Sequence, residues 1–185
     1  MPLRVIGGSA GGRILKGPRP GVRPTSDRVR EATFDILAAN GADFSRVLDL
    51  YSGTGAMGIE ALSRGEGSAD FVEADPKASE IVRENLALTG LKSRGRVLPM
   101  PVSRALGRLE GPYTLVVADP PYEYDRAEEE LASLIEKGLL AQGGTLVVEH
   151  SKRREWPQTL AGLPQLTSRR YGDTSVTFYR SEGPN

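Results

Sequence analysis

VLDLYSGTGAMG, residues 47–58, is the stretch that decides the fold. Val47 to Leu50 form a short strand of the buried type, the glycines form a tight turn, and residues 56–64 have a helical pattern that ends at Gly65. A GxGxxG turn between a strand and a helix is typical of ligand-binding α/β domains. We therefore expect a doubly wound parallel sheet with its ligand at the carboxyl end of this strand.

Strands and helices keep alternating beyond this turn. We expect strands over 70–74, 95–100, 113–118 and 145–149, separated by helices over 75–89, 102–109 and 126–140. Gly143-Gly144 should turn the chain into the strand at 145–149, and the C-terminal region predicts an antiparallel hairpin of 166–171 with 174–180. The predicted fold class is α/β, with a seven-stranded, mostly parallel sheet that ends in this hairpin.

The N-terminal part is predicted to add a small appendage and one helix. Leu3–Ile6 and Arg13–Lys16 should pair as a β-hairpin across the flexible connection GGSAGG, before a Pro/Gly-rich linker. A helix from Thr25 or Ser26 to about residue 39 follows, with Phe34 off a buried face made of Val29, Ala32, Thr33, Ile36 and Leu37. This gives a basic arm and linker at 1–24, the main domain at 25–180 and a loose tail at 181–185.

Composition excludes several classes of protein. The chain has 185 residues, 38% of them hydrophobic and 26% charged, which suits one packed domain. The absence of cysteine excludes disulfides, thiolate metal sites and a cysteine nucleophile. The single histidine, His150, is interpreted as structural, so we expect neither a metal site nor a Ser-His-Asp triad. Without a membrane-length apolar run or a signal-peptide pattern, a cytoplasmic monomer with no membrane partner is expected.

Charge is balanced over the whole chain but not along it. Residues 1–30 carry seven basic side chains against Asp27 alone, whereas residues 31–150 have a net charge of −9. A basic end on an acidic body favours an anionic partner, and RNA contacts are predicted here. The alternative is that these side chains only keep the arm soluble. The predicted RNA-binding residues are Arg4, Arg13, Lys16, Arg23, Arg28 and Arg30.

The glycine turn alone leaves two ligands open. Glu73 lies 20 residues beyond Gly53, where a ribose-binding carboxylate belongs, so a nicotinamide- or flavin-dependent oxidoreductase is one interpretation. Asp49 argues against it, because a carboxylate at the mouth of the site would repel a pyrophosphate. S-adenosyl-L-methionine has no phosphate, and its ammonium would pair with Asp49. A structural alternative is that Asp49 only caps a backbone amide.

Asp-Pro-Pro-Tyr, residues 119–122, directly follows the apolar strand at 113–118. The prolines fix the chain where an open α/β sheet binds its ligand. This aims two acceptors, the Asp119 carboxylate and the Pro120 carbonyl, at one point, which suits the two hydrogens of a planar exocyclic amine. Tyr122 offers a ring on which a flipped base can stack. The alternative is an ordinary turn.

Several longer segments resemble one family of methyltransferases. RVIGGSAGGRIL, RPTSDRVREATFDIL, VLDLYSGTGAMGIEALSRG, FVEAD and ADPPY are similar to the RsmD family over roughly residues 3–180. The resemblance implies a Rossmann-like fold and transfer of a methyl group from S-adenosyl-L-methionine to the N2 amine of a guanine in bacterial 16S ribosomal RNA. The substrate would be the free RNA or an assembling small ribosomal subunit.

The resemblance also implies roles for particular residues. Those assigned to the cofactor are Asp49, Ser52, Gly53, Gly55, Glu73 and Val102, and those assigned to the target amine are Asp119, Pro120, Pro121 and Tyr122. Residues 99–103 lack the carboxylate that such enzymes often place near the adenine, which leaves the Val102 backbone for that contact. Thr25, Asp27, Arg28 and Glu31 could shape the active site, contact RNA or brace the helix.

Three other functions stay open from the sequence. One is another amino methyltransferase, acting on adenine N6 in DNA or RNA or on a protein glutamine. The second is an NAD-dependent oxidoreductase that uses the glycine turn. The third is a non-catalytic RNA-binding factor in ribosome assembly, against which the intact Asp-Pro-Pro-Tyr motif argues.

Overall fold

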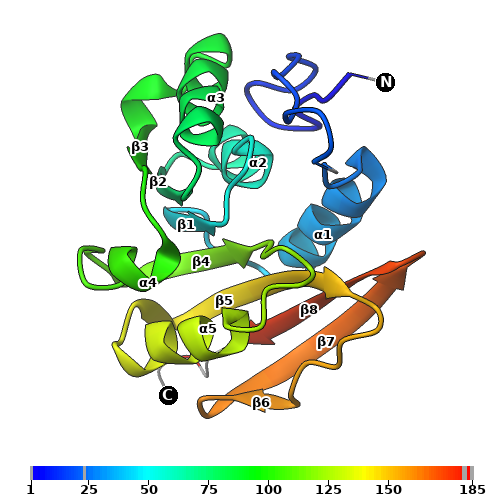
Figure 1. Ribbon diagram of the computed structural model, residues 1–185, viewed down its shortest axis with the longest axis vertical. Helices are drawn as coiled ribbons and strands as arrows, with labels where there is room; N and C mark the ends of the chain where they lie inside the picture. The colour runs from blue at the N-terminus through cyan, green and yellow to red at the C-terminus, as the bar shows by residue number, and fades with distance from the viewer. Residues whose placement is uncertain (1, 23, 181–182, 184–185) are drawn as a thin grey trace.

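The computed structural model describes residues 2–22, 24–180 and 183. One sheet runs through it in the order β3-β2-β1-β4-β5-β8-β7-β6 (Figure 1). Its strands are β1 (Arg46–Leu50), β2 (Ser68–Val72), β3 (Gly95–Leu98), β4 (Tyr113–Ala118), β5 (Leu140–Ser151), β6 (Thr159–Leu160), β7 (Leu163–Tyr171) and β8 (Thr174–Arg180). The first five strands are parallel, and β8, β7 and β6 continue the sheet in antiparallel pairing.

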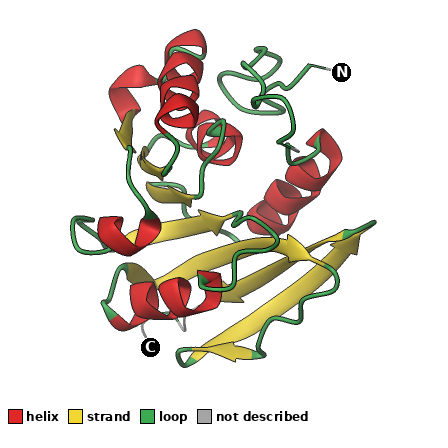
Figure 2. Cartoon of the chain, in the orientation of Figure 1, coloured by secondary structure: helices red, strands yellow, loops and turns green. Residues whose placement is uncertain are grey.

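Five α-helices flank the sheet (Figure 2). They are α1 (Asp27–Ala39), α2 (Ala56–Arg64), α3 (Pro76–Leu88), α4 (Val102–Ala105) and α5 (Ala127–Glu136), with a 3₁₀ turn at Lys92–Arg94. Local chemistry sets their first residues. Ser26 caps α1 by accepting the Val29 N–H at 3.2 Å, and Asp75 caps α3, whose first residue is proline. Among the described residues, no helix combines the length and hydrophobicity needed to cross a membrane.

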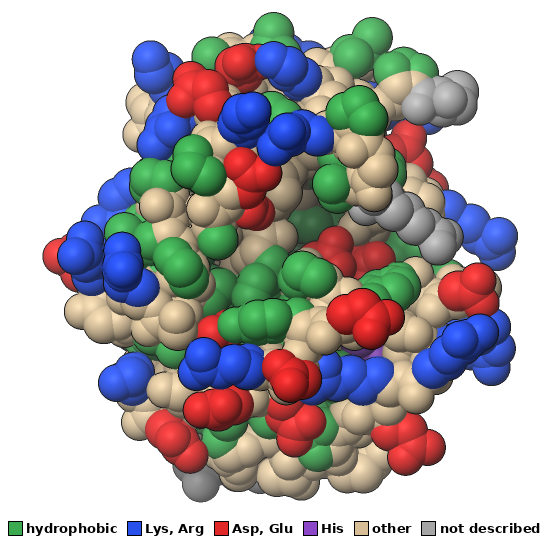
Figure 3. Space-filling model, in the orientation of Figure 1, with side chains coloured by type: hydrophobic (Ala, Val, Ile, Leu, Met, Phe, Trp, Pro, Cys, Tyr) green, Lys and Arg blue, Asp and Glu red, His purple; other side chains and the backbone are tan. Residues whose placement is uncertain are grey.

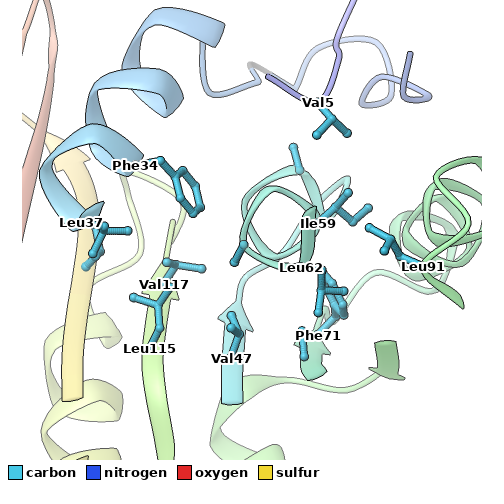
Figure 4. Close-up of a cluster of buried hydrophobic side chains, with 14 of the residues drawn as sticks. Val5, Phe34, Leu37, Val47, Ile59, Leu62, Phe71, Leu91, Leu115 and Val117 are labelled. Atoms are coloured by element: carbon cyan, nitrogen blue, oxygen red, sulfur yellow. The ribbon is translucent and has the colours of Figure 1, made fainter. Parts of the chain in front are cut away.

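Strand β4 shows why the sheet needs helices on both faces. Leu115 and Val117 belong to the core on the side of α1, α2 and α3, whereas Val116 and Ala118 belong to the core on the side of α4 and α5. Side chains alternate along a strand, so a strand that is apolar throughout is stable only when both faces are covered. Figure 4 shows the first core, where Leu115 and Val117 lie near Leu37 and Phe34 of α1.

The structure confirms the α/β fold and corrects its details. The sheet has eight strands rather than seven, because the short β6 pairs with β7 at the edge. Helix α5 ends at Glu136 instead of 140, and β5 begins at Leu140. Gly143 and Gly144 lie inside β5, where the register with β4 shifts, so they form a bulge rather than the predicted turn.

Two predicted helices also differ. Phe34 is fully buried, whereas Ala32 and Ile36 are only half-buried, so the buried face of α1 is rotated from the expected one. The ring centroids of Phe34 and Phe44 lie 5.9 Å apart. Phe44 lies outside the helix, so the helical periodicity could not reveal this contact. Helix α4 ends at Ala105 instead of 109, with α-helical turns giving way to a short loop.

The N-terminal segment pairs as the predicted hairpin and is also fastened to the domain. Its two predicted strands meet in the bridge of Arg4 with Ile14, and the Val5 and Leu15 N–H groups donate to the Arg13 and Leu3 carbonyls at 2.9 Å and 2.8 Å. The connection GGSAGG was expected to be flexible, and this expectation is wrong. The backbone N–H groups of Ile6 and Gly7 each donate to the buried Glu60 carboxylate of α2 at 2.8 Å, and Ala10 N–H donates to Ser63 Oγ at 2.9 Å.

Candidate active site

A cavity of about 860 Å³ opens where β1 and β4 end. The chain runs from β1 outward to β3 on one side and from β4 to β5 on the other, so the strand order reverses between β1 and β4. Open α/β sheets bind ligands at such a point. Figure 3 shows the hollow near the centre of this face, with hydrophobic and acidic side chains in it. The N-terminal segment supplies a further wall through Leu3, Pro24, Thr25 and Val29.

Asp49 lines the cavity from β1 and is almost fully buried. Its Oδ2 accepts the Gly58 N–H of α2 at 2.9 Å, so the predicted capping role is real and coexists with a place at the cavity. A Cβ on Gly58 would lie 2.4 Å from the Phe71 ring and 3.0 Å from this carboxylate, so only glycine lets α2 approach so closely. Burial raises the pKa of Asp49 well above its usual range, and the nearby Glu73 adds to the rise.

Glu73 holds the glycine turn from the neighbouring strand. Its carboxylate accepts the N–H of Gly53 at 2.7 Å and the N–H of Asp75 at 2.9 Å. These bonds fix the carboxylate at the cavity wall with further acceptor capacity on each oxygen. Gly53 has φ of +56°, and a Cβ there would meet nothing within 4 Å, so the turn itself presents open space.

Of the other predicted cofactor residues, two line the cavity and one does not. Ser52 and Val102 line the same cavity. Gly55 is outside the described lining and instead begins α2 with φ of +79°.

The Asp119–Tyr122 segment lines the same cavity as the glycine turn. All four residues, Asp119, Pro120, Pro121 and Tyr122, line it. The Asp119 N–H reaches the Leu50 carbonyl of β1 at 3.4 Å, which holds the motif at the end of the sheet. Tyr122 is 40% exposed, and its hydroxyl lies 2.6 Å from Thr174 Oγ1 of β8, so its ring is held at the rim of the cavity.

Thr25 and Glu149 line the cavity together with Asp119. Thr25 Oγ1 lies 3.1 Å from Asp119 Oδ2 and 2.8 Å from Glu149 Oε2. Burial raises the pKa of Asp119 well above its usual range, and the charge of Glu149 raises it further. The role of Thr25 was open from the sequence, and Glu149 was missed. The signal for it was a carboxylate at the carboxyl end of the apolar strand around 145–149, the edge where ligands bind.

A further carboxylate, that of Glu130, joins the two loops that border the cavity. Glu130 of α5 accepts the Tyr51 hydroxyl at 2.5 Å and the Tyr124 hydroxyl at 2.7 Å. Tyr51 precedes the glycine turn and has φ of +54°, an unusual backbone conformation for a bulky residue. Tyr124 follows the Asp119–Tyr122 segment, so Glu130 fixes the separation of the two loops. Sequence reasoning had no signal for this bond.

The charge of the cavity selects its ligand. Five carboxylates are found among its described lining residues, and no lysine, arginine or histidine is. The carboxylates are Asp49, Glu73, Asp75, Asp119 and Glu149. Asp75 pairs with Arg19 at 3.2 Å. The remaining carboxylates would repel a pyrophosphate, whereas a positively charged ligand would be attracted. The geometry therefore disfavours a dinucleotide.

The predicted RNA contacts differ in their exposure. Arg4, Arg13, Lys16 and Arg28 are exposed, although Lys16 pairs with Glu84 at 2.6 Å and Arg4 with Asp27 at 3.5 Å. Arg23 lies outside the described residues. The prediction for Arg30 is wrong, because its side chain is fully buried.

Arg30 has a structural place in the interior. It pairs with Asp27 at 2.9 Å and with Glu60 at 3.8 Å, and it donates to the Arg4 carbonyl. His150 is likewise buried, with Nε2 2.8 Å from Thr177 Oγ1, in keeping with its structural interpretation.

Known proteins are similar to this chain in sequence and in fold. The model of the family described as Conserved hypothetical protein 95 matches residues 3–180. Ribosomal RNA small subunit methyltransferase D of Escherichia coli K12 is 34% identical over 181 residues, which cover 97% of this chain and 90% of that protein. The structure of a hypothetical protein from Thermus thermophilus is 34% identical, with a TM-score of 0.80 and coverage of 97% of this chain and 99% of that chain.

A more distant structure shares the fold alone. It is an RNA methyltransferase from Salinibacter ruber in complex with S-adenosyl-L-homocysteine, with 19% identity, a TM-score of 0.64 and coverage of 88% and 96% of the two chains. The Rossmann-like methyltransferase fold expected from the sequence is therefore confirmed. The family match spans nearly the whole chain, including the glycine turn and the Asp119–Tyr122 segment. The chain belongs to the Conserved hypothetical protein 95 family, the RsmD family that its sequence resembles.

Proposed function

We propose that this protein transfers a methyl group from S-adenosyl-L-methionine to the N2 amine of a guanine in 16S ribosomal RNA. The observation that carries the proposal is a single cavity lined both by the glycine turn with its carboxylates and by the Asp119–Tyr122 segment. The glycine turn suits a cationic cofactor, and the Asp119–Tyr122 segment suits a planar amine. The name of the Escherichia coli relative, a ribosomal RNA small subunit methyltransferase, supports RNA as the substrate.

The residues present fit S-adenosyl-L-methionine. Its ammonium and sulfonium are cations, and Asp49 and Glu73 are the carboxylates of the glycine turn. We assign the ammonium to Asp49 and the ribose hydroxyls to Glu73, whose position is fixed by two backbone N–H groups. Val102 and Val72 give the apolar wall that an adenine ring needs. When bound, the cofactor supplies an electrophilic methyl group.

The protein's own task is to orient the amine. Asp119 and the Pro120 carbonyl accept its two hydrogens, and the exposed ring of Tyr122 stacks on the base. Holding nitrogen and methyl carbon in line contributes roughly 7–11 kcal/mol in well-oriented reactions. Acceptors at the amine also stabilise the positive charge that develops on nitrogen as the bond forms.

The target base must leave its helix to reach this cavity. Enzymes that modify bases in duplexes flip the base out and stack it on an aromatic side chain. Tyr122 stands at the rim, where such a base enters. The exposed basic residues Arg4, Arg13, Lys16 and Arg28 belong to the N-terminal part of the chain, which also supplies a wall of the cavity, and we assign them to the RNA backbone.

Methyl-transfer assays test the proposal. The protein is incubated with methyl-labelled S-adenosyl-L-methionine and either 16S RNA or small ribosomal subunits, and the digested nucleosides are separated. N2-methylguanosine is the expected product, and it should be absent with Asp119→Ala. Label in N6-methyladenosine or in protein glutamine would replace the proposed substrate with one of the alternatives. No transfer to any of these would refute methyl-transfer activity.

A further inference from the structure

Three oxygens of the cavity lining form a chain. Thr25 Oγ1 lies between Asp119 Oδ2 and Glu149 Oε2, at 3.1 Å and 2.8 Å. They come from three separate elements: the residues before α1, the end of β4 and the end of β5. Both carboxylates lie within hydrogen-bonding reach of the one hydroxyl, with Glu149 at a typical O–H···O distance and Asp119 slightly farther away.

A count of protons shows what this chain requires. A threonine hydroxyl has one proton to donate, and an ionised carboxylate has none. The hydroxyl can therefore donate fully to only one carboxylate at a time, and a second full hydrogen bond needs one more proton, on Asp119 or Glu149. If one carboxyl holds it, that carboxyl donates to Thr25, and Thr25 donates to the other.

The surroundings favour holding this proton. Asp119 faces Glu149 from β5 and Asp49 from β1, and both negative charges oppose its ionisation. Burial has the same effect, and among the described residues only the Thr25 hydroxyl stabilises the charged form. Two carboxyls so placed share one proton, as paired carboxyls in one site generally do.

We propose that Glu149 and Thr25 form a proton relay that sets the charge of Asp119 during catalysis. This role rests on the proposed methyl transfer. Before the amine binds, the shared proton can sit on Asp119. When the amine binds, each proton moves one oxygen along: Asp119 gives its proton to Thr25, and Thr25 gives its own to Glu149. The result is an ionised Asp119 that accepts the amine hydrogens, with no net gain or loss of protons.

The same relay receives the proton of the product. The nitrogen lone pair forms the bond to the methyl carbon, while the carbon–sulfur bond breaks and its electron pair stays on sulfur. The positive charge thereby passes to the nitrogen, which gives one proton to Asp119. The pair then holds two protons and releases one to water, restoring the resting state. Glu149 acts through Thr25 and is a positioning residue, whereas Asp119 contacts the amine.

Carboxyl titration in the free protein gives a test that does not depend on activity. Side chains are labelled with ¹³C, and Asp119 and Glu149 are assigned from Asp119→Asn and Glu149→Gln. We expect one proton to remain on the pair well above the usual range of carboxyl pKa values. In Glu149→Gln, Asp119 should ionise at lower pH, by about one unit or more. If both carboxyls titrate in their usual range, the shared proton does not exist and the relay is refuted.

The dependence of turnover on pH tests the catalytic part. Wild-type turnover should fall as pH drops through the lower of the pair's two apparent pKa values, where a second proton binds and Asp119 can no longer ionise. Glu149→Gln should reduce the plateau, because the proton has lost its second site. Thr25→Val should move the fall to higher pH, because the hydroxyl that stabilises ionised Asp119 is lost, and should lower turnover on the order of 10²-fold.

Matched variants separate the relay from a structural effect. Thr25→Ser retains the hydroxyl and should restore the wild-type pH profile. Thr89→Val removes a buried hydroxyl bonded to the Asn85 carbonyl, away from the cavity, and should change neither turnover nor the profile. If Thr25→Val lowers turnover without moving the profile, or if Glu149→Gln leaves the plateau at the wild-type value, the relay is overturned. A protein with the shared proton but no methyl transfer would refute the proposed function alone.

Discussion

Asp49 and Asp119 lie at the carboxyl ends of the neighbouring strands β1 and β4, yet their partners differ. Asp49 accepts a backbone N–H, whose proton is permanent, while Asp119 meets a hydroxyl and a second carboxylate. A backbone amide fixes a carboxylate in place and favours its charged form. A hydroxyl that can donate either way allows the charge to change. We therefore infer that Asp49 recognises a cation, whereas Asp119 gains and loses a proton.

Removing Asp119 should give the largest effect of any single change at these two carboxylates. Asp119→Ala is expected to reduce turnover by several orders of magnitude, because the amine loses its acceptor. Cofactor affinity, measured by calorimetry, should stay close to that of the wild-type protein, since Asp49 and Glu73 are untouched. Wild-type turnover in this variant would remove Asp119 from the site.

For Asp49, the expected loss is in cofactor affinity. Asp49→Ala is expected to weaken S-adenosyl-L-methionine binding by roughly 1.5–3 kcal/mol, the range for a hydrogen bond to a charged group. Calorimetry against the wild-type protein measures this loss. An unchanged affinity would show that Asp49 only supports the Gly58 amide and that the two carboxylates are less different than we infer.

Tyr122 sharpens the comparison at the Asp119–Tyr122 segment. Tyr122→Ala should weaken productive RNA binding by roughly 1–3 kcal/mol, the value of a base–aromatic stack. Tyr122→Phe keeps the ring and loses only the contact with Thr174, so its KM for RNA should lie near the wild-type value. Equal losses in the two variants would assign the effect to the hydroxyl rather than to stacking.

Cofactor affinity should also depend on pH through Asp49. Its pKa is raised by burial, and the ionised form binds the ammonium, so affinity is present above this raised pKa and is lost as pH falls through it. The expected slope is about tenfold per pH unit below the pKa. Asp49→Asn should bind weakly with little pH dependence. A wild-type affinity that is flat down to the usual aspartate range would contradict the assignment.

The smallest expected effect is on the RNA affinity that the N-terminal arm, residues 1–24, contributes. Replacing Arg4, Arg13 and Lys16 with alanine should flatten the dependence of log affinity on log salt by roughly one unit per lost phosphate contact. The present pairs of Arg4 and Lys16 with carboxylates are exposed and worth little, so RNA can displace them. Cofactor affinity is the control and should not change. A wild-type salt slope would limit these side chains to solubility.

Local motifs were enough to predict where Asp49 and Asp119 lie, but not where Thr25 and Glu149 lie. The glycine turn and Asp-Pro-Pro-Tyr each follow a strand directly, so chain geometry alone places Asp49 and Asp119 at the ligand-binding edge. Thr25 and Glu149 are 124 residues apart, and no short pattern relates them. Arg30 was misjudged because counting charges cannot tell a buried guanidinium from an exposed one. Its partner Glu60 lies on a different helix, and only the packing of α1 against α2 brings them together.

The attachment of the N-terminal segment has a consequence for how the protein is made. Residues 6 and 7 hold to Glu60, and Lys16 N–H holds to Asn85, 69 residues later in the chain. Thr25 contacts Glu149, which is translated 124 residues after it. The stretch of cavity wall around Thr25 is therefore made early but gains this contact only after β5 has been translated.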